Sequence, residues 1–180
     1  MKMKKFETKT MVGAAFFTAL GVLFPQMFHL FGAVNGKIFL PMHIPVLLCG
    51  FLCGKRYGAL CGLIVPLISS AATGMPVLYP TGLSMMAELA AYGFMAGLLS
   101  ERFSVYPSLI GAMLAGRAVS GVANLILLGM AGNVYSLEAF VSTAFLTAAP
   151  GIAIQLVAVP LLVMALRRAG LMGFLRPAES

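Results

Sequence analysis

The segment that decides the fold is residues 38–73, IFLPMHIPVLLCGFLCG-KR-YGALCGLIVPLISSAAT, in which one basic pair separates two apolar stretches. The only Lys, Arg, Asp or Glu residues in this segment are Lys55 and Arg56. A membrane-spanning helix needs about 20 largely apolar residues, and basic residues collect at the ends of such helices. The segment therefore predicts two antiparallel membrane helices joined by a short basic turn.

The rest of the chain has the same apolar character. Of its 180 residues, 61% are apolar and 9% are charged, against about half and about a quarter in soluble domains. A soluble domain of this size cannot hide so much apolar surface from water. The apolar runs are also too long and too uniform for the alternating strands of a β-barrel. We therefore expect one all-α integral membrane domain covering residues 1–180.

Six stretches are apolar enough for membrane helices, and short turns separate them. They run over about Thr10–Phe31, Ile38–Gly54, Tyr57–Thr73, Pro80–Leu99, Pro107–Met130 and Leu137–Leu166. The short connections predict a compact bundle in which neighbouring helices are antiparallel. The first stretch has the basic flank of a signal peptide, but its apolar run is too long, so we expect it to be retained.

The basic residues orient the bundle, because Lys and Arg collect in cytoplasmic loops. With the amino terminus inside, ten of the twelve Lys and Arg residues lie on the cytoplasmic side: Lys2, Lys4, Lys5, Lys9, Lys55, Arg56, Arg102, Arg167, Arg168 and Arg176. Lys37 lies outside, and Arg117 lies within the fifth span. We expect both termini in the cytoplasm. The net positive charge of the chain then reflects membrane topology rather than nucleic-acid binding.

Missing residues exclude several kinds of chemistry. The chain has no Asp, which excludes metal sites and phosphoryl transfer built on aspartate. His29 and His43 are fourteen positions apart with no Cys or Asp near them, which is poor spacing for zinc. No Gly-rich loop ending in Lys-Ser or Lys-Thr is present, so uphill transport needs an ion gradient or a partner. We expect neither a metal nor a cofactor in this chain.

Two ionisable residues lie where a bilayer makes them costly, Glu88 in the fourth span and Arg117 in the fifth. From the helical rise, Glu88 lies about 12 Å below the outer edge and Arg117 about 15 Å above the inner edge. Two interpretations stay open. The residues form a structural ion pair between two helices, or one or both line a water-filled cavity and hold a polar ligand.

Further polar side chains share these helix faces, since residues three or four apart lie together on a helix. Tyr92 shares a face with Glu88, and Asn124 shares one with Arg117 nearer the outer surface. Gln155 adds an amide on the sixth span. Such a polar stripe from mid-membrane to the outside is typical of an outward-opening pocket.

A second polar group surrounds the turn between the first two spans and includes Asn35, Lys37 and His43. In one interpretation, His43 only bonds a backbone carbonyl at the level of the headgroups. In the other, this loop caps a pocket from outside, and Lys37 or His43 faces the ligand.

Small residues recur at helical spacing, as in the pairs Gly58–Gly62 and Gly93–Gly97. Such faces let helices approach closely, and we interpret most of them as packing within the bundle. Ala15 and Ala19 on the first span form a further pair. This pair is the candidate for docking another protein.

The most specific signal is a long run across the second and third spans. It reads FLPMHIPVLLCGF at 39–51, GKRYGA at 54–59, PL at 66–67 and TGMP at 73–76. With the six short-looped helices and the small-residue face on the first, this run resembles the substrate-binding S component of an energy-coupling factor (ECF) vitamin transporter. The resemblance covers nearly the whole chain and is to the group that includes folate and pantothenate binders.

This resemblance implies a substrate-binding subunit in the cell membrane of a prokaryote, without ATPase activity of its own. A membrane T component and two cytoplasmic ATPases, which hydrolyse the ATP, would be its partners. It implies that Ala15 and Ala19 dock the T component. The pocket is formed mainly by the last three helices and capped by loops, which makes candidates of Asn35, Lys37, His43, Glu88, Tyr92, Arg117, Asn124 and Gln155.

The ligand and two other classes of function remain open at this stage. Lys37 and Arg117 against the single carboxylate of Glu88 favour an acidic ligand, such as pantothenate or a folate-like acid. An autonomous ion-coupled carrier is the alternative, although the two halves of the chain show no convincing repeat. An intramembrane enzyme is less favoured, because no serine has a histidine placed to act as its base.

Overall fold

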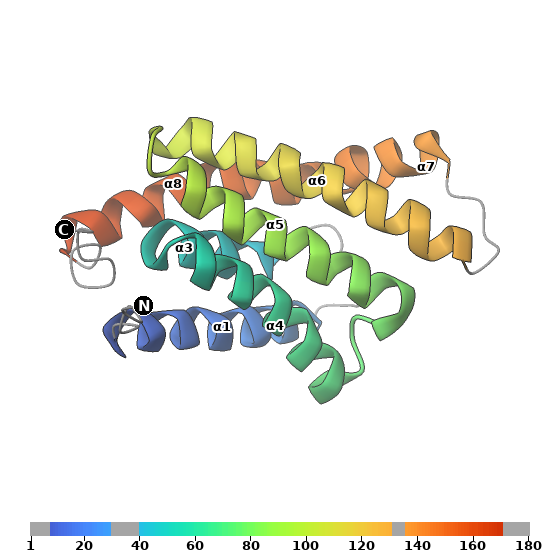
Figure 1. Cartoon of the computed structure of the whole chain (residues 1–180), viewed down its shortest axis with the longest axis horizontal. Coiled ribbons are helices and arrows are strands. Elements are labelled where there is room, and N and C mark those ends of the chain that lie inside the picture. The colour runs from blue at the N-terminus through green and yellow to red at the C-terminus, as the bar shows by residue number, and fades with distance from the viewer. Residues whose placement is uncertain (1–7, 30–39, 131–135, 171–180) are drawn as a thin grey trace, which may run out of the picture.

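The computed structural model describes residues 8–29, 40–130 and 136–170, and these residues contain helices and no strands. The elements are α1 (Thr8–His29), α3 (His43–Cys53), α4 (Lys55–Thr73), a kinked π-helical segment η1 (Leu78–Gly82), α5 (Leu83–Leu99), α6 (Val105–Met130), α7 (Leu137–Val141), a π-helical turn η2 (Ser142–Thr147) and α8 (Ala149–Arg168). Figure 1 shows them as an elongated bundle in which α1 begins and α8 ends at the same end.

Five stretches of the described chain are long and apolar enough to cross a membrane: Thr8–Met27, Lys55–Thr73, Leu78–Leu99, Val105–Met130 and Ala149–Arg168. They overlap the first, third, fourth, fifth and sixth expected spans. Many of their large apolar side chains are exposed, including Met27 at 62% and Leu114 at 59%. Apolar side chains facing outward on long helices are the surface that lipid requires.

The second expected span differs from the prediction, because α3 is an 11-residue helix. At the usual rise it is about 16 Å long, roughly half the hydrocarbon thickness of a bilayer. The helix begins late because Leu40 has a φ of 50° and Pro41 follows it, so the backbone cannot be helical there. The first turn closes when His43 N–H donates to the carbonyl of Leu40 at 3.1 Å.

Helix α3 is the centre of the bundle. All of its residues except Ile44 are buried, and Val46, Leu47 and Phe51 are fully buried. It packs against α1, α4, α5 and α8, which lie around it in Figure 1. A short helix surrounded by longer ones has no lipid-facing side, which explains why its sequence is apolar without a polar face.

Glycines allow α4 and α5 to pack with their backbones in contact. A Cβ on Gly93 would collide with the carbonyl of Gly58, and one on Gly62 would collide with the backbone of Leu89. Gly97 meets the backbone of Lys55 in the same way. The predicted packing role of the pairs Gly58–Gly62 and Gly93–Gly97 is therefore confirmed.

Two expected helix boundaries are wrong. Lys55 and Arg56 form the first turn of α4 rather than a loop, because Gly54 alone, with a φ of 90°, makes the break from α3. The sixth expected span, 137–166, is not one helix but the series α7, η2 and α8, with a break at Ala148. Pro150 follows this break and fits the first turn of α8, where its missing N–H costs nothing.

Candidate functional site

The predicted pairing of Glu88 and Arg117 is present. Arg117 Nη1 lies 2.9 Å from Glu88 Oε1, and the two side chains are 9% and 7% exposed. Glu88 comes from the middle of α5 and Arg117 from the middle of α6, and these two helices pack along their length. The ion pair is therefore buried between neighbouring helices, where each charge depends on its partner.

His43 and Tyr92 extend this pair into a cluster. His43 Nε2 lies 3.6 Å from the same Oε1 atom of Glu88. The rings of His43 and Tyr92 meet edge to face, with centroids 5.0 Å apart. His43 is 1% exposed, and neither of its ring nitrogens makes a hydrogen bond. The interpretation that His43 bonds a backbone carbonyl at the headgroup level is therefore wrong.

The cluster is short of hydrogen-bond partners. In this cluster, the unpaired buried atoms of the described residues include Arg117 Nε and Nη2, Tyr92 Oη and both ring nitrogens of His43. Both amide atoms of Gln155 on α8 are also unpaired. Each such atom costs about 1–3 kcal/mol when it is buried without a partner. Several of them gathered near one ion pair mark a place where water or a ligand completes the hydrogen bonding.

Asn124 and Gln155 occupy different surroundings. Asn124 is half-buried, and its Nδ2 donates to Ser120 Oγ at 3.5 Å, one turn from Arg117. Gln155 is fully buried on α8, which packs against both α3 and α6. The structure thus places Glu88, Tyr92 and His43 directly around Arg117, and Asn124 along the same helix. Asn35 and Lys37 lie outside the described residues.

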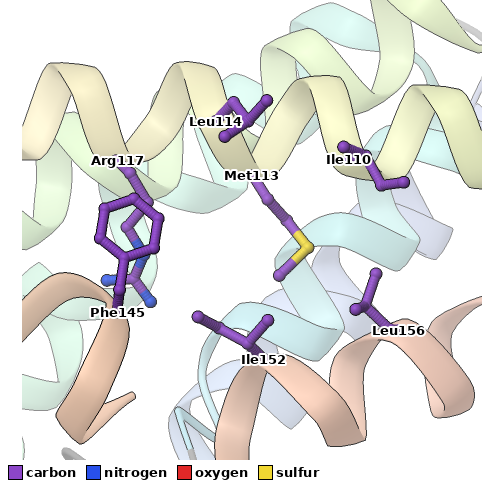
Figure 2. A pocket seen from close by; sticks show the side chains of 7 residues that line it. All are labelled: Ile110, Met113, Leu114, Arg117, Phe145, Ile152 and Leu156. Atoms are coloured by element: carbon purple, nitrogen blue, oxygen red, sulfur yellow. The ribbon is translucent and has the colours of Figure 1, made fainter. Parts of the chain in front are cut away.

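A small cavity of about 140 Å³ lies beside this cluster, between α6 on one side and η2 and α8 on the other. Its lining is apolar apart from Arg117, and consists of Ile110, Met113, Leu114, Phe145, Ile152 and Leu156. In Figure 2 the Arg117 side chain extends from α6 toward the η2 segment that carries Phe145, at one end of the cavity, and the Phe145 ring lies across it in this view. The cavity therefore has one cationic end and an apolar body.

Sequence reasoning did not find the apolar residues of this cavity. Met113, Ile152 and Leu156 look like any other residues of an apolar span, because nothing in a run of such side chains marks the ones that face a void. Helical spacing could have identified one of these residues. Met113 lies four residues before Arg117 and therefore shares its face.

A second hollow is an open groove of about 830 Å³ between α1 and α4. Ala15 and Ala19 line it together with Ala14, Thr18, Met11, Val22 and Leu23 of α1 and Tyr57, Leu60, Cys61, Ile64 and Ile68 of α4. Ala15 and Ala19 are exposed, whereas Ala14 is 8% exposed and faces the bundle. The predicted small-residue pair therefore faces outward, over an apolar groove.

Five long apolar helices around a buried ion pair are typical of a multi-pass membrane protein. The chain matches the family model described as ECF transporter, substrate-specific component, over residues 9–174, and it belongs to that family. This is a family of transporter components and not of enzymes. No curated protein and no solved structure matched the chain.

Proposed function

We propose that this chain is the high-affinity substrate-binding subunit of an ECF importer for a water-soluble vitamin or a related small molecule. The observation that carries the proposal is the cluster around Arg117, whose buried donors and acceptors lack partners beside a cavity. An ion pair that served only to hold two helices together would need neither. The ligand supplies the missing hydrogen bonds, and the apolar wall supplies contact area.

The pocket opens toward the outside in this proposal. Asn124 lies about two turns beyond Arg117 toward the carboxyl end of α6, which is the outer end in this orientation, and His43 begins α3 beside Glu88. The loop that contains Asn35 and Lys37 closes the pocket from outside. Its position in the chain, directly before α3, supports this role because α3 brings His43 to the cluster.

The orientation that we propose has one domain that crosses the membrane six times, the second time through the short buried helix α3, and both termini in the cytoplasm of a prokaryotic cell. The fold supports it, because α1 begins and α8 ends at one end of the bundle (Figure 1). Lys9, Arg56, Arg102 and Arg168 lie at helix ends or turns that face this same end. Basic residues gathered at one end are typical of the cytoplasmic side.

Transport itself requires partners in this proposal, namely a membrane T component and two ATPases. The groove between α1 and α4 is the docking surface that we assign to the T component. The side chains of Ala15 and Ala19 are single methyl groups and lie one helical turn apart. A helix of the partner can therefore approach the backbone of α1 closely.

Uptake in cells that lack their own ECF proteins tests this function. Cells that produce this chain together with a T component and both ATPases should accumulate a small molecule from complex medium, measured by comparative mass spectrometry. Cells that produce the chain with an ATPase unable to hydrolyse ATP are the matched control and should not accumulate it. Equal accumulation in both would instead support an autonomous ion-coupled carrier.

A further inference from the structure

The free edge of the Arg117 guanidinium limits what the pocket can bind. Glu88 occupies Nη1, while Nε and Nη2 have no partner in the described chain. These two nitrogens lie on the same side of the planar group and point their N–H bonds in parallel. A carboxylate matches this geometry with its two oxygens, as in side-on bidentate arginine pairs.

The cavity sets the size of the apolar group that fits beside Arg117, and it is open on one side, where Ile110, Leu114 and Phe145 are 48%, 59% and 39% exposed. An apolar cavity of about 150 Å³ holds one benzene molecule, and the cavity beside Arg117 has about 140 Å³. All of its other lining residues are apolar, so no second polar group on the ligand would find a partner there. A folate, which joins a pteridine, a benzoate and a glutamate, is several times larger than this space.

We propose that the substrate is a compact monocarboxylate whose apolar body has about the size of one six-membered ring. The carboxylate accepts hydrogen bonds from Nε and Nη2 of Arg117. The ring or branched chain lies against Met113, Ile152 and Leu156. This proposal rests on the proposed function and names the class of substrate that the importer takes up.

The charges of the cluster favour an acid over a neutral or cationic ligand. A cation would face Arg117, whose counterion Glu88 is already engaged. A neutral amide offers one acceptor oxygen and leaves one of the two free donors unpaired, at a cost of about 1–3 kcal/mol. A bound acid instead places its negative charge beside the cation of Arg117.

Benzoate and benzamide are the matched probes, because they differ only in the charged group. We expect benzoate to raise the thermal midpoint of the purified protein and to bind in calorimetry, and benzamide to do neither. Arg117→Lys is the matched variant, since lysine keeps the charge beside Glu88 but lacks the two parallel N–H bonds. It should melt like the wild type without ligand and bind benzoate about 10-fold more weakly or worse.

Three results would overturn the proposed substrate class: no response to benzoate at millimolar concentration, equal binding of benzamide, or unchanged benzoate affinity in Arg117→Lys. Mass spectrometry of the molecule that accumulates in the uptake experiment separates this failure from failure of the proposed function. A neutral, cationic or folate-sized molecule overturns the substrate class and leaves the importer role intact. If no molecule accumulates in an ATPase-dependent way, the importer role fails as well.

Discussion

Arg117 and Glu88 meet through a single pair of atoms, Nη1 and Oε1, at 2.9 Å, while the other edge of the arginine stays free. The sequence left two roles open for these residues, a structural pair or a ligand site. The structure contains the pair, and it also contains the buried donors that a ligand needs. We therefore treat Glu88 as the residue that holds the guanidinium in place and Arg117 as the residue that meets the substrate.

Glu88→Gln should destabilise the protein strongly. It leaves the buried cation of Arg117 without a counterion, and breaking such a pair costs about 3–5 kcal/mol. Adding Arg117→Gln to this variant should restore much of the stability, because no charge is then left unpaired. Denaturant or thermal melts of the singles and the double variant measure this effect.

Glu101→Gln is the control for that experiment. It breaks an ion pair of similar length, with Lys55 Nζ 3.2 Å from Glu101 Oε1, but both side chains are about one-third exposed. An exposed pair contributes about 0–1 kcal/mol. If Glu88→Gln cost no more than Glu101→Gln, the pair would not be buried as described.

Gly93→Ala should disrupt the packing of α5 on α4. The added methyl group would collide with the backbone carbonyl of Gly58, which cannot move without shifting a helix. We expect a loss of about 1–3 kcal/mol or more in the free energy of unfolding. Gly129→Ala is the control, because a Cβ there meets nothing within 4 Å. Equal melting temperatures of the two variants would contradict the close contact.

Ala15→Trp and Ala19→Trp should abolish uptake while leaving ligand binding by the isolated subunit unchanged. A Trp at either position fills the groove between α1 and α4 without entering the core, since both alanines are exposed. Val122→Trp is the control, because this residue is 59% exposed on α6 and lies outside the groove. If the alanine variants lost ligand binding to the same degree as uptake, the face would serve internal packing instead.

Labelling with a membrane-impermeant thiol reagent should reveal the orientation. We expect Asn35→Cys to react in intact cells, and Arg56→Cys to react only after the membrane is opened. The three native cysteines, Cys49, Cys53 and Cys61, are at most 5% exposed, so the unmodified protein provides a low background. The reverse order of reactivity would contradict cytoplasmic termini.

Much of the fold follows from the apolar stretches and the short turns that separate them. Five expected spans overlap long helices, because a run of apolar residues has no other stable form in a bilayer. The exception is α3, which periodicity cannot distinguish from a spanning helix. Its length depends on the backbone at Leu40 and Pro41, and its burial depends on the helices that surround it.

The candidate site was predictable only in its polar part. Glu88 and Arg117 stand out because charges are costly inside a bilayer, and their pairing follows from neighbouring helices. The contact of His43 with Glu88 joins residues 45 positions apart and depends on how α3 packs on α5. The cavity beside Arg117 depends on side-chain packing between α6 and α8, which no local pattern of sequence encodes.

The most direct test of the central claim is to compare the small molecules that copurify with the wild-type subunit and with Arg117→Gln. Small molecules are extracted from equal amounts of folded wild-type and variant protein, and the extracts are analysed by mass spectrometry. We expect a small carboxylic acid in near-stoichiometric amount with the wild type and its loss from the variant. The same molecule at the same occupancy in both samples would contradict a substrate site built on Arg117.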